Sequence, residues 1–360
     1  MPASRVSQQD LDLVLAHTAP LWDEVRGQRI FLTGGTGFFG CWLVESFCSI
    51  NRALDLGAEI TILTRSARAF AQNCPHLVSD PAVTLHPGDV RTFTFPGGEY
   101  RYVVHAATES WARQAEMAPP FASIASLSTD MDRLSTAIGG TGRALEFAAA
   151  HGAQKFLLTS SGGVYGKQPA HLTHLPETYT GAPDQLDTAS IYAEGKRVSE
   201  LMCAVYQERA ELECKIARCW TFCGPHLPLD RHFAIGNFIG DVLAGRSIQI
   251  HGDGTPRRSY LYAVDLVIWL WTILFQAPPL VPFNVGSARD LSILELAQVV
   301  AATLNPQTQI HVAREAGPDA APARYVPSVE RAQTLLGLRE RVALEDAIRR
   351  TAAWHKGSSD

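Results

Sequence analysis

The chain has 360 residues, of which 46% are hydrophobic and 19% are charged. This balance is typical of a globular protein with a sizeable core, and it excludes the disordered, collagen-like and coiled-coil classes. The 31 basic and 36 acidic residues give a net charge of −5, and no basic block interrupts the chain. The charge therefore argues against a nucleic-acid or anionic-membrane surface and favours a small-molecule partner.

Two further features concern the cellular setting. The longest apolar stretch, Leu266 to Phe275, is shorter than the ~20 residues that cross a bilayer, so we expect no membrane association and a cytoplasmic location. The seven cysteines show no CxxC spacing, which argues against a disulfide framework or a zinc site. We expect reduced thiols packed as small hydrophobic groups, and no bound metal.

The predicted elements alternate along the chain. Residues 1–27 form an extension with an amphipathic helix that is interrupted near Pro20. An apolar run at 29–33, bounded by glycines, predicts a buried strand, and helical spacing follows over 38–50. The pattern continues with strands at 59–64, 82–86, 102–106, 155–160 and 213–220, and with helices at 134–151 and 191–211. Such alternation implies right-handed crossovers, so we predict an α/β fold with a doubly wound parallel sheet.

A glycine-rich turn lies between the first predicted strand and helix, with the sequence TGGTGFFG over residues 33–40. Glycines permit positive φ angles and leave the backbone open to a pyrophosphate, while the helix N-terminus attracts negative charge. A GxGxxG match alone is weak, but its place between a strand and a helix makes it specific. In this Rossmann-type fold we expect a cofactor to contact Gly34, Gly37, Phe38, Phe39 and Gly40.

The chain divides into three predicted parts. Residues 1–27 are the helical extension, and residues 28–224 form the dinucleotide-binding domain, to which a segment near 259–287 returns. After residue 224 the regular alternation loosens, which indicates a second domain. This smaller, mostly C-terminal substrate-binding domain is expected to comprise residues 225–258 and 288–360.

The residues after the second strand bear on the choice between NAD and NADP. A dinucleotide site usually has an acid there, which holds the ribose 2′-hydroxyl. This chain instead reads Thr64-Arg65-Ser66. Arg65 and Ser66 suit a 2′-phosphate, so the residues favour NADP. The alternative is that Arg65 is solvated and stacks on adenine.

Three residues form a candidate proton-transfer set. Tyr192 and Lys196 are four apart on a predicted helix, so their side chains share one face. A nearby ammonium and an oxidised nicotinamide both favour the phenolate of a tyrosine, whose free pKa is about 10. Tyr192 can then accept a hydroxyl proton as hydride leaves the same carbon. Ser161, at the carboxyl end of a strand, is the candidate donor to the substrate oxygen.

Together these motifs resemble the extended short-chain dehydrogenase/reductase family, in particular the NAD(P)-dependent nucleotide-sugar epimerase/dehydratase group. The resemblance covers about residues 28–355 and rests on five segments in order: TGGTGFFG, SSGGVYG, YAEGK, GDGTPRRSYLY and FNVGS. It implies an enzyme whose catalytic residues are Ser161, Tyr192 and Lys196 and whose substrate is a nucleoside-diphosphate sugar. It also implies a homodimer, formed through helices 134–151 and 191–211 of each subunit.

The resemblance implies further contacts. Asp89 and Val90 match the pair that contacts adenine, and Ala106 and Ala107 match the strand end that lines the cofactor, which Tyr192 and Lys196 also contact. Arg258 matches the arginine that grips the substrate diphosphate, an anion that suits a guanidinium fork. Two more substrate-binding candidates are Asn237, with helix capping as the alternative role, and Thr221, which stands where the family usually has an asparagine.

Two glycines depart from part of the family. Dehydratases that eliminate water across C5 and C6 carry an acidic residue directly after the triad hydroxyl, whereas this chain has Gly162-Gly163. Elimination needs both a base and an acid, which glycines do not supply. A 4,6-dehydratase or a glutamate-dependent decarboxylase is therefore disfavoured, unless another acid such as Glu109 takes that role.

The leading hypothesis is a nucleotide-sugar C4 epimerase, in which hydride leaves C4, the 4-keto sugar turns over and hydride returns to its other face. A first alternative is a 4-ketoreductase that consumes NADPH, which Arg65 favours. A second is a 4,6-dehydratase. An alternative of another class is a non-catalytic regulator that senses dinucleotide, although such a protein is expected to have lost Tyr192 or Lys196.

Overall fold

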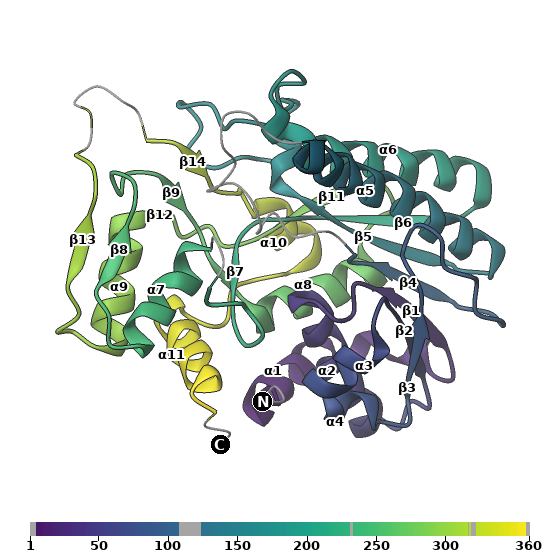
Figure 1. Cartoon of the computed structure of the whole chain (residues 1–360). Coiled ribbons are helices and arrows are strands. Elements are labelled where there is room, and N and C mark those ends of the chain that lie inside the picture. Colours follow the sequence, from purple (N-terminus) through teal and green to yellow (C-terminus); the bar gives the residue numbers. More distant parts are fainter. Residues whose placement is uncertain (1–4, 108–123, 231–232, 316, 318–321, 358–360) are drawn as a thin grey trace.

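The computed structural model describes residues 5–107, 124–230, 233–315, 317 and 322–357. A seven-stranded sheet forms its centre, in the order β11-β6-β5-β4-β1-β2-β3, and all its strand pairs are parallel. Helices cover both faces of the sheet (Figure 1). The predicted doubly wound α/β fold is therefore confirmed, and each predicted strand is found within one residue of its expected limits. The strands are β1 (Arg29–Thr33), β2 (Glu59–Thr64), β3 (Val83–Pro87), β4 (Tyr102–His105), β5 (Lys155–Ser161), β6 (Glu213–Cys219) and β11 (Pro282–Val285).

Alternate residues of the central strands supply two separate hydrophobic cores, because a strand directs successive side chains to opposite faces. Ile30 and Leu32 of β1 belong to the core on one face, whereas Phe31 between them packs against Phe93 and Phe147 on the other. The three β1 side chains are at most 1% exposed. Burial on both faces explains why this strand is a continuous apolar run in the sequence.

Two groups of helices make the covering layers. α5 and α6 lie together on one face, and α1, α2 and α8 pack together on the other (Figure 1). None of the helices in the described ranges is both long enough and apolar enough to cross a membrane. The helices are α1 (Gln8–Thr18), α2 (Phe38–Ala53), α3 (Ala67–Asn73), α4 (Pro75–Val78), α5 (Ile124–Ala150), α6 (Ile191–Ala210), α7 (Ala234–Leu243), α8 (Ala263–Gln276), α9 (Ile293–Leu304), α10 (Glu330–Leu336) and α11 (Leu344–His355).

The N-terminal extension is part of the core. α1 is followed by a short 3-10 turn that contains Pro20, which agrees with the predicted interruption of the helix. Beyond it Trp22 is fully buried, and its ring centroid lies 4.9 Å from that of Trp271 on α8. The buried carboxylate of Asp10 accepts hydrogen bonds from the hydroxyl of Tyr262, at 2.7 Å, and from the guanidinium of Arg350. Segments that are distant in the sequence therefore meet under α1.

Three small sheets lie outside the large one: β7 pairs with β10, β9 with β12 and β14, and β8 with β13. In the same region α7, α9 and α11 pack together, on the side of the molecule away from β3 (Figure 1). The limits of the predicted domains stay a prediction, although α8 and β11 both lie within the segment 259–287: β11 pairs with β6 in the large sheet, and α8 packs against that sheet. The short strands are β7 (Phe222–Cys223), β8 (Ile248–Ile250), β9 (Arg257–Arg258), β10 (Leu261–Tyr262), β12 (Leu291–Ser292), β13 (Ile310–Val312) and β14 (Arg324–Tyr325).

Candidate active site

The glycine turn joins β1 to α2 at the carboxyl edge of the sheet, where the strand order reverses between β1 and β4. Ligands of open α/β sheets bind at such a point. Gly34 has a φ of +74°, and a Cβ atom there would lie 2.5 Å from the backbone of Ala106. A Cβ on Gly40 would lie 2.2 Å from the carbonyl oxygen of Gly34. Both positions therefore require glycine because the protein packs against itself there.

Gly37 differs from these two glycines. A Cβ atom at this position would meet nothing closer than the carbonyl oxygen of Gly34, at an ordinary contact distance of 3.5 Å. Gly37 is exposed and is the N-cap of α2, without a side-chain capping bond. The first amides of the helix, starting at Phe38 and Phe39, are thus left to a ligand. This cradle fits the pyrophosphate of a dinucleotide.

The strand ends beside the turn hold the next predicted cofactor contacts. Ala106 and Ala107 directly follow β4, and their amides donate to the carbonyl and the hydroxyl oxygens of Thr33, at 3.1 and 3.2 Å. These bonds hold the end of β4 against the end of β1. The two alanines consequently lie at the carboxyl edge of the sheet, directly beside the glycine turn.

The expected adenine end lies at the carboxyl ends of β2 and β3. Arg65 and Ser66 are exposed after β2, and the hydroxyl of Ser66 caps α3. Asp89 and Val90 follow β3. The guanidinium of Arg91, 2.9 Å from Asp89, holds the pKa of that carboxyl below its usual range, and the charge of Arg65 adds to the effect. The four predicted residues therefore lie together at the carboxyl ends of β2 and β3.

The candidate catalytic residues meet at the carboxyl end of β5. Ser161 ends this strand, and its Oγ accepts a hydrogen bond from the amide of Gly163 at 3.0 Å. On α6, the Nζ atom of Lys196 lies 6.0 Å from the ring centre of Tyr192, in accordance with their spacing. Lys196 is 3% exposed and donates to the carbonyl oxygen of Thr159 at 2.8 Å. That bond fixes the ammonium beside the phenol.

Tyr325 of β14 joins this cluster, and the sequence analysis missed it. Its hydroxyl lies close enough to Ser161 and Tyr192 to interact electrostatically with both. Burial raises the pKa of this phenol, so Tyr325 keeps its proton near pH 7. Its ring packs on Trp220, with the centroids 4.3 Å apart. No motif surrounds Tyr325, so nothing in the sequence marks it as a site residue.

Position 162 is closed to a side chain. A Cβ atom on Gly162 would lie 2.7 Å from the ring of Trp220 and 2.7 Å from the hydroxyl oxygen of Tyr325. A carboxylate at this position would have to displace one of these two packed aromatic residues. Glu109, the acid named as a substitute, lies outside the described residues.

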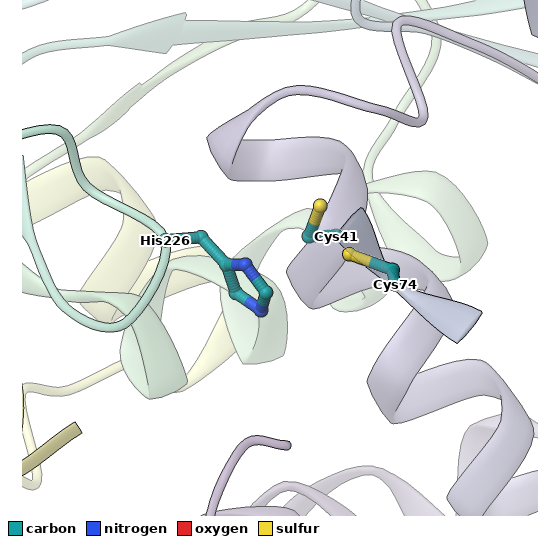
Figure 2. Close-up of side chains that lie close together, drawn as sticks. All are labelled: Cys41, Cys74 and His226. Carbon is teal, nitrogen blue, oxygen red and sulfur yellow. The ribbon is translucent and has the colours of Figure 1, made fainter. Parts of the chain in front are cut away.

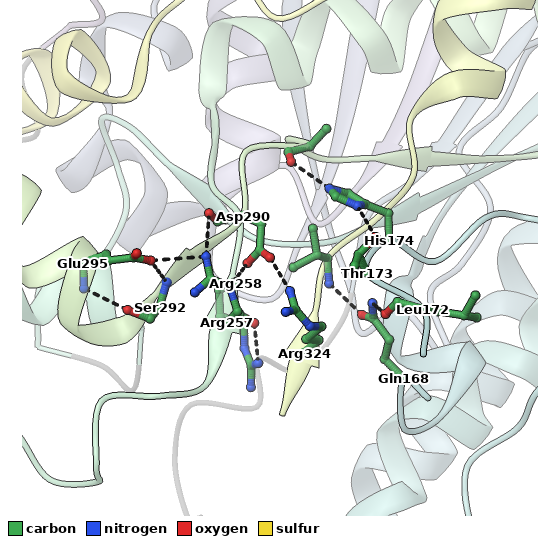
Figure 3. Close-up of polar contacts among 12 residues, drawn as sticks. Gln168, Leu172, Thr173, His174, Arg257, Arg258, Asp290, Ser292, Glu295 and Arg324 are labelled. Atoms are coloured by element: carbon green, nitrogen blue, oxygen red, sulfur yellow. Dashed lines mark hydrogen bonds and ion pairs between the residues drawn. The ribbon is translucent and has the colours of Figure 1, made fainter. Parts of the chain in front are cut away.

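Three arginines gather where β9 pairs with β14 (Figure 3). Arg257 and Arg324 both form ion pairs with Asp290, the first at 2.7 Å. Arg258 instead donates to the backbone oxygen of Arg257 at 2.9 Å, and its guanidinium lies 5.6 Å from the ring centre of Tyr325. No carboxylate in the described part of the chain pairs with Arg258. Its charge is therefore available to an anionic substrate, beside the candidate catalytic residues.

The remaining two substrate-binding predictions fall on other elements. Thr221 donates its hydroxyl hydrogen to the backbone oxygen of Ser259, so it ties the starts of β7 and β10 together. Asn237 is half-buried on α7, in the group of helices that α7 forms with α9 and α11. Their roles toward a substrate stay predictions.

Comparison with known proteins identifies the family of this chain. Residues 30–286 match the model of the NAD dependent epimerase/dehydratase family. The chain belongs to this family. The resemblance drawn from the motifs is therefore confirmed, and the glycine cradle fits the dinucleotide that gives the family its name.

Individual members of the epimerase/dehydratase family show the extent of the likeness. UDP-glucuronic acid decarboxylase 2 of Arabidopsis thaliana is 29% identical over 329 residues, which cover 91% of this chain and 68% of the relative. The UDP-glucose 4-epimerase of Thermotoga maritima superposes with a TM-score of 0.72 at 20% identity, covering 92% of this chain and 99% of that one. For the dTDP-glucose 4,6-dehydratase of Streptomyces venezuelae, with NAD bound, the TM-score is 0.72 at 22% identity, with 92% and 97% coverage. These structures share the fold.

In this family member, the burial of Lys196 has a measurable consequence for stability. Burial lowers the pKa of Lys196 to about 8, whereas a lysine of the unfolded chain titrates near ~10.4. Between these pH values the unfolded chain binds more protons than the folded one, so the free energy of unfolding rises with pH, by at most about 1.4 kcal/mol per unit. We expect Lys196→Met to lose this rise.

Urea unfolding at several pH values between about 7 and 10 measures the effect. The matched control is Lys356→Met, which removes an exposed lysine and is expected to keep the wild-type slope. Equal slopes for wild type and Lys196→Met would contradict the prediction.

Proposed function

We propose that this protein epimerises a nucleoside-diphosphate sugar at C4 through a 4-keto intermediate. The observation that carries the proposal is position 162, where glycine supplies no carboxylate and where Trp220 and Tyr325 fill the space of a side chain. C4 epimerisation needs one acid–base group at O4, whereas elimination needs a further acid and base at C5 and C6. The described residues around Ser161 supply the first requirement.

The proposed mechanism assigns a task to each residue of the cluster. When bound, the nicotinamide accepts hydride from C4 and returns it. Tyr192 takes the proton from O4 in the first step and gives it back in the second. The ammonium of Lys196, held by Thr159, favours the phenolate of Tyr192. The hydroxyls of Ser161 and Tyr325 donate hydrogen bonds to the sugar oxygen as its charge changes.

Arg258 is the proposed anchor for the substrate. Its guanidinium is not neutralised by a carboxylate of the described residues, and it lies over Tyr325, which in turn contacts Ser161. Binding of the diphosphate there holds the nucleotide while the 4-keto sugar turns over. We therefore propose that Arg258 contributes to substrate affinity and does not take part in proton transfer.

We also propose that NADP is the preferred cofactor. Arg65 and Ser66 stand after β2, where an acid would select the free 2′-hydroxyl of NAD, and both are exposed. The positive charge of Arg65 suits a 2′-phosphate. The family assignment does not distinguish NADP from NAD, so the proposed preference rests on Arg65 and Ser66 alone.

A homodimer through α5 and α6 is the proposed assembly. Large apolar side chains are exposed on both helices: Met131 is 56% exposed on α5, and Leu201 and Val205 are 64% and 37% exposed on α6. Leu201 and Val205 are four residues apart and share one helical face. Exposed apolar groups that cluster on neighbouring elements commonly mark an interface.

Decarboxylation is the second candidate function, because UDP-glucuronic acid decarboxylases of several species are among the relatives, at up to 29% identity. Both candidates begin with oxidation at C4 and leave the cofactor unchanged overall. They differ in what happens to the 4-keto sugar, since decarboxylation removes a carboxyl group and epimerisation keeps every atom.

One assay separates these functions. The purified protein is incubated with UDP-glucuronic acid and with UDP-, dTDP-, GDP- and CDP-hexoses, with dinucleotide in catalytic amount. We expect a product of unchanged mass with inverted C4, and dinucleotide retained by the protein until denaturation. Loss of CO₂ would establish the decarboxylase, loss of water the dehydratase, and stoichiometric consumption of NADPH the ketoreductase. Mass spectrometry of the released dinucleotide tests the NADP preference.

A further inference from the structure

A second cluster of reactive side chains, which does not include the triad, comprises two cysteines and a histidine (Figure 2). Cys41 is in the first turn of α2, Cys74 lies between α3 and α4, and His226 follows β7. One ligand atom from each residue lies within 4.8 Å of the other two. The two cysteines are 4% and 2% exposed, and the side chain of His226 is 7% exposed. Three separate segments thus place two thiols and an imidazole together in the interior.

The imidazole of His226 has an unusual environment. Its Nε2 atom is buried and has no hydrogen-bond partner among the described residues. Leaving a buried polar atom unsatisfied costs about 1–3 kcal/mol, and folded proteins rarely do so. A buried imidazole nitrogen that lacks a hydrogen-bond partner is a potential metal ligand.

A carboxylate stands at the edge of this cluster. Glu45 is one helical turn after Cys41, on the same face of α2. Its Oε1 atom lies 2.6 Å from Nε2 of His76 and 4.0 Å from Nε2 of His226. The side chain of Glu45 is 6% exposed, so it offers a buried negative charge to a cation.

We propose that Cys41, Cys74 and His226 bind a divalent cation of the zinc type, with Glu45 as the fourth ligand. Two sulfurs, a nitrogen and an oxygen are a donor set that suits tetrahedral Zn²⁺. Zn–S and Zn–N bonds of about 2.3 and 2.0 Å place tetrahedral ligands about 3.5–3.8 Å apart. The ligand atoms of Cys41, Cys74 and His226, now within 4.8 Å of one another, need to approach by about 1 Å. Binding forms two Zn–S bonds and releases the two thiol protons to solvent.

The proposed site would link α2 of the large-sheet region to the loop between β7 and α7. Cys41 follows Gly40 in the helix that begins with the phosphate cradle, and His226 lies in the loop that leads to α7. We therefore expect a structural role, in which the ion holds this loop against α2 and stabilises the folded state by its binding free energy.

The chain contains a matched control. Cys203 and Cys214 are also a buried, interacting pair of thiols, but they lie in the hydrophobic core on the opposite face of the sheet. The metal-ligand groups found in the described residues do not include this pair. Cys203→Ser thus removes one thiol of a buried pair without touching the proposed site.

The test uses the full chain, reduced and stripped of metal with a chelator, then loaded with Zn²⁺ or Co²⁺ and desalted. We expect about one equivalent of retained metal per chain, a sulfur-to-cobalt charge-transfer band and visible tetrahedral cobalt bands. The melting temperature is expected to rise with Zn²⁺. His226→Ala and Cys74→Ser are expected to lose the retained metal and the rise, whereas Cys203→Ser keeps both.

Three results would overturn the proposal. The first is that the reduced wild type retains no metal. The second is that Cys203→Ser loses metal as Cys74→Ser does. The third is a Cys41–Cys74 disulfide in the protein as purified, which thiol titration would show as two fewer than the seven thiols of the sequence. Because a cysteine variant can fail to fold, His226→Ala, checked by circular dichroism, decides the result.

Discussion

Tyr192→Phe is expected to lower turnover by about 10²–10⁴-fold, the usual contribution of a positioned acid–base group. The substitution keeps the aromatic ring beside Lys196 and removes only the hydroxyl that takes the O4 proton. The protein should therefore fold and retain its dinucleotide. Initial rates with the sugar nucleotide that the assay above identifies measure the loss, and the absorbance of reduced nicotinamide shows whether hydride still leaves C4.

The control for this variant is Tyr206→Phe, which removes a phenol hydroxyl from the same helix, α6, without touching the triad. We expect its turnover to equal that of wild type. Unchanged turnover in Tyr192→Phe would remove the residue from the mechanism. An equal loss in both variants would show that the effect comes from the helix and not from proton transfer.

Two alanine substitutions in the glycine turn are both expected to weaken dinucleotide binding, but only one of them is expected to lower stability. A methyl group at Gly37 meets only an ordinary 3.5 Å contact within the protein, but it occupies the space of the pyrophosphate. We expect Gly37→Ala to keep the wild-type melting temperature and to bind dinucleotide about 10–100-fold more weakly, as a steric conflict of about 1–3 kcal/mol implies.

At Gly40 the methyl group would lie 2.2 Å from a backbone oxygen, so the turn itself must move. Gly40→Ala is therefore expected to lower the melting temperature and the dinucleotide affinity together. Thermal unfolding and titration calorimetry measure both quantities. Gly97→Ala is the control, since its Cβ meets nothing within 4 Å. Wild-type dinucleotide affinity in Gly37→Ala would show that the phosphates bind elsewhere.

Local patterns explain most of what the sequence could predict. β1 could be recognised because both of its faces are buried, which makes the run apolar throughout. Tyr192 and Lys196 could be paired because one helical turn separates them. The start of α5 was placed at residue 134, whereas the helix begins at Ile124. Ile124, Leu127 and Met131 continue the helical apolar spacing toward the N-terminus, but the Ser, Thr and Asp residues between them resemble a loop, which explains the late predicted start.

Features made by distant segments escaped the sequence analysis. Tyr325 reaches Ser161 only because β14 pairs with β9, and no spacing rule connects the two residues. The expectation that no metal is bound rests on the absence of closely spaced cysteines, whereas Cys41 and Cys74 lie on separate segments. The resemblance to the family, and no property of the local sequence, marks Arg258 and not Arg257 as the diphosphate-binding residue. The structure adds a physical reason, since Asp290 neutralises Arg257 but not Arg258.

The buried ion pair beneath α1 sets an order of assembly during synthesis. Asp10 and Arg350 are 340 positions apart, and the carboxylate is 1% exposed. A buried carboxylate without its partner costs several kcal/mol. We therefore expect α1 to pack stably in its final position only after α11, which carries Arg350, has been synthesised. A helix that leaves the ribosome early is thus among the last to dock.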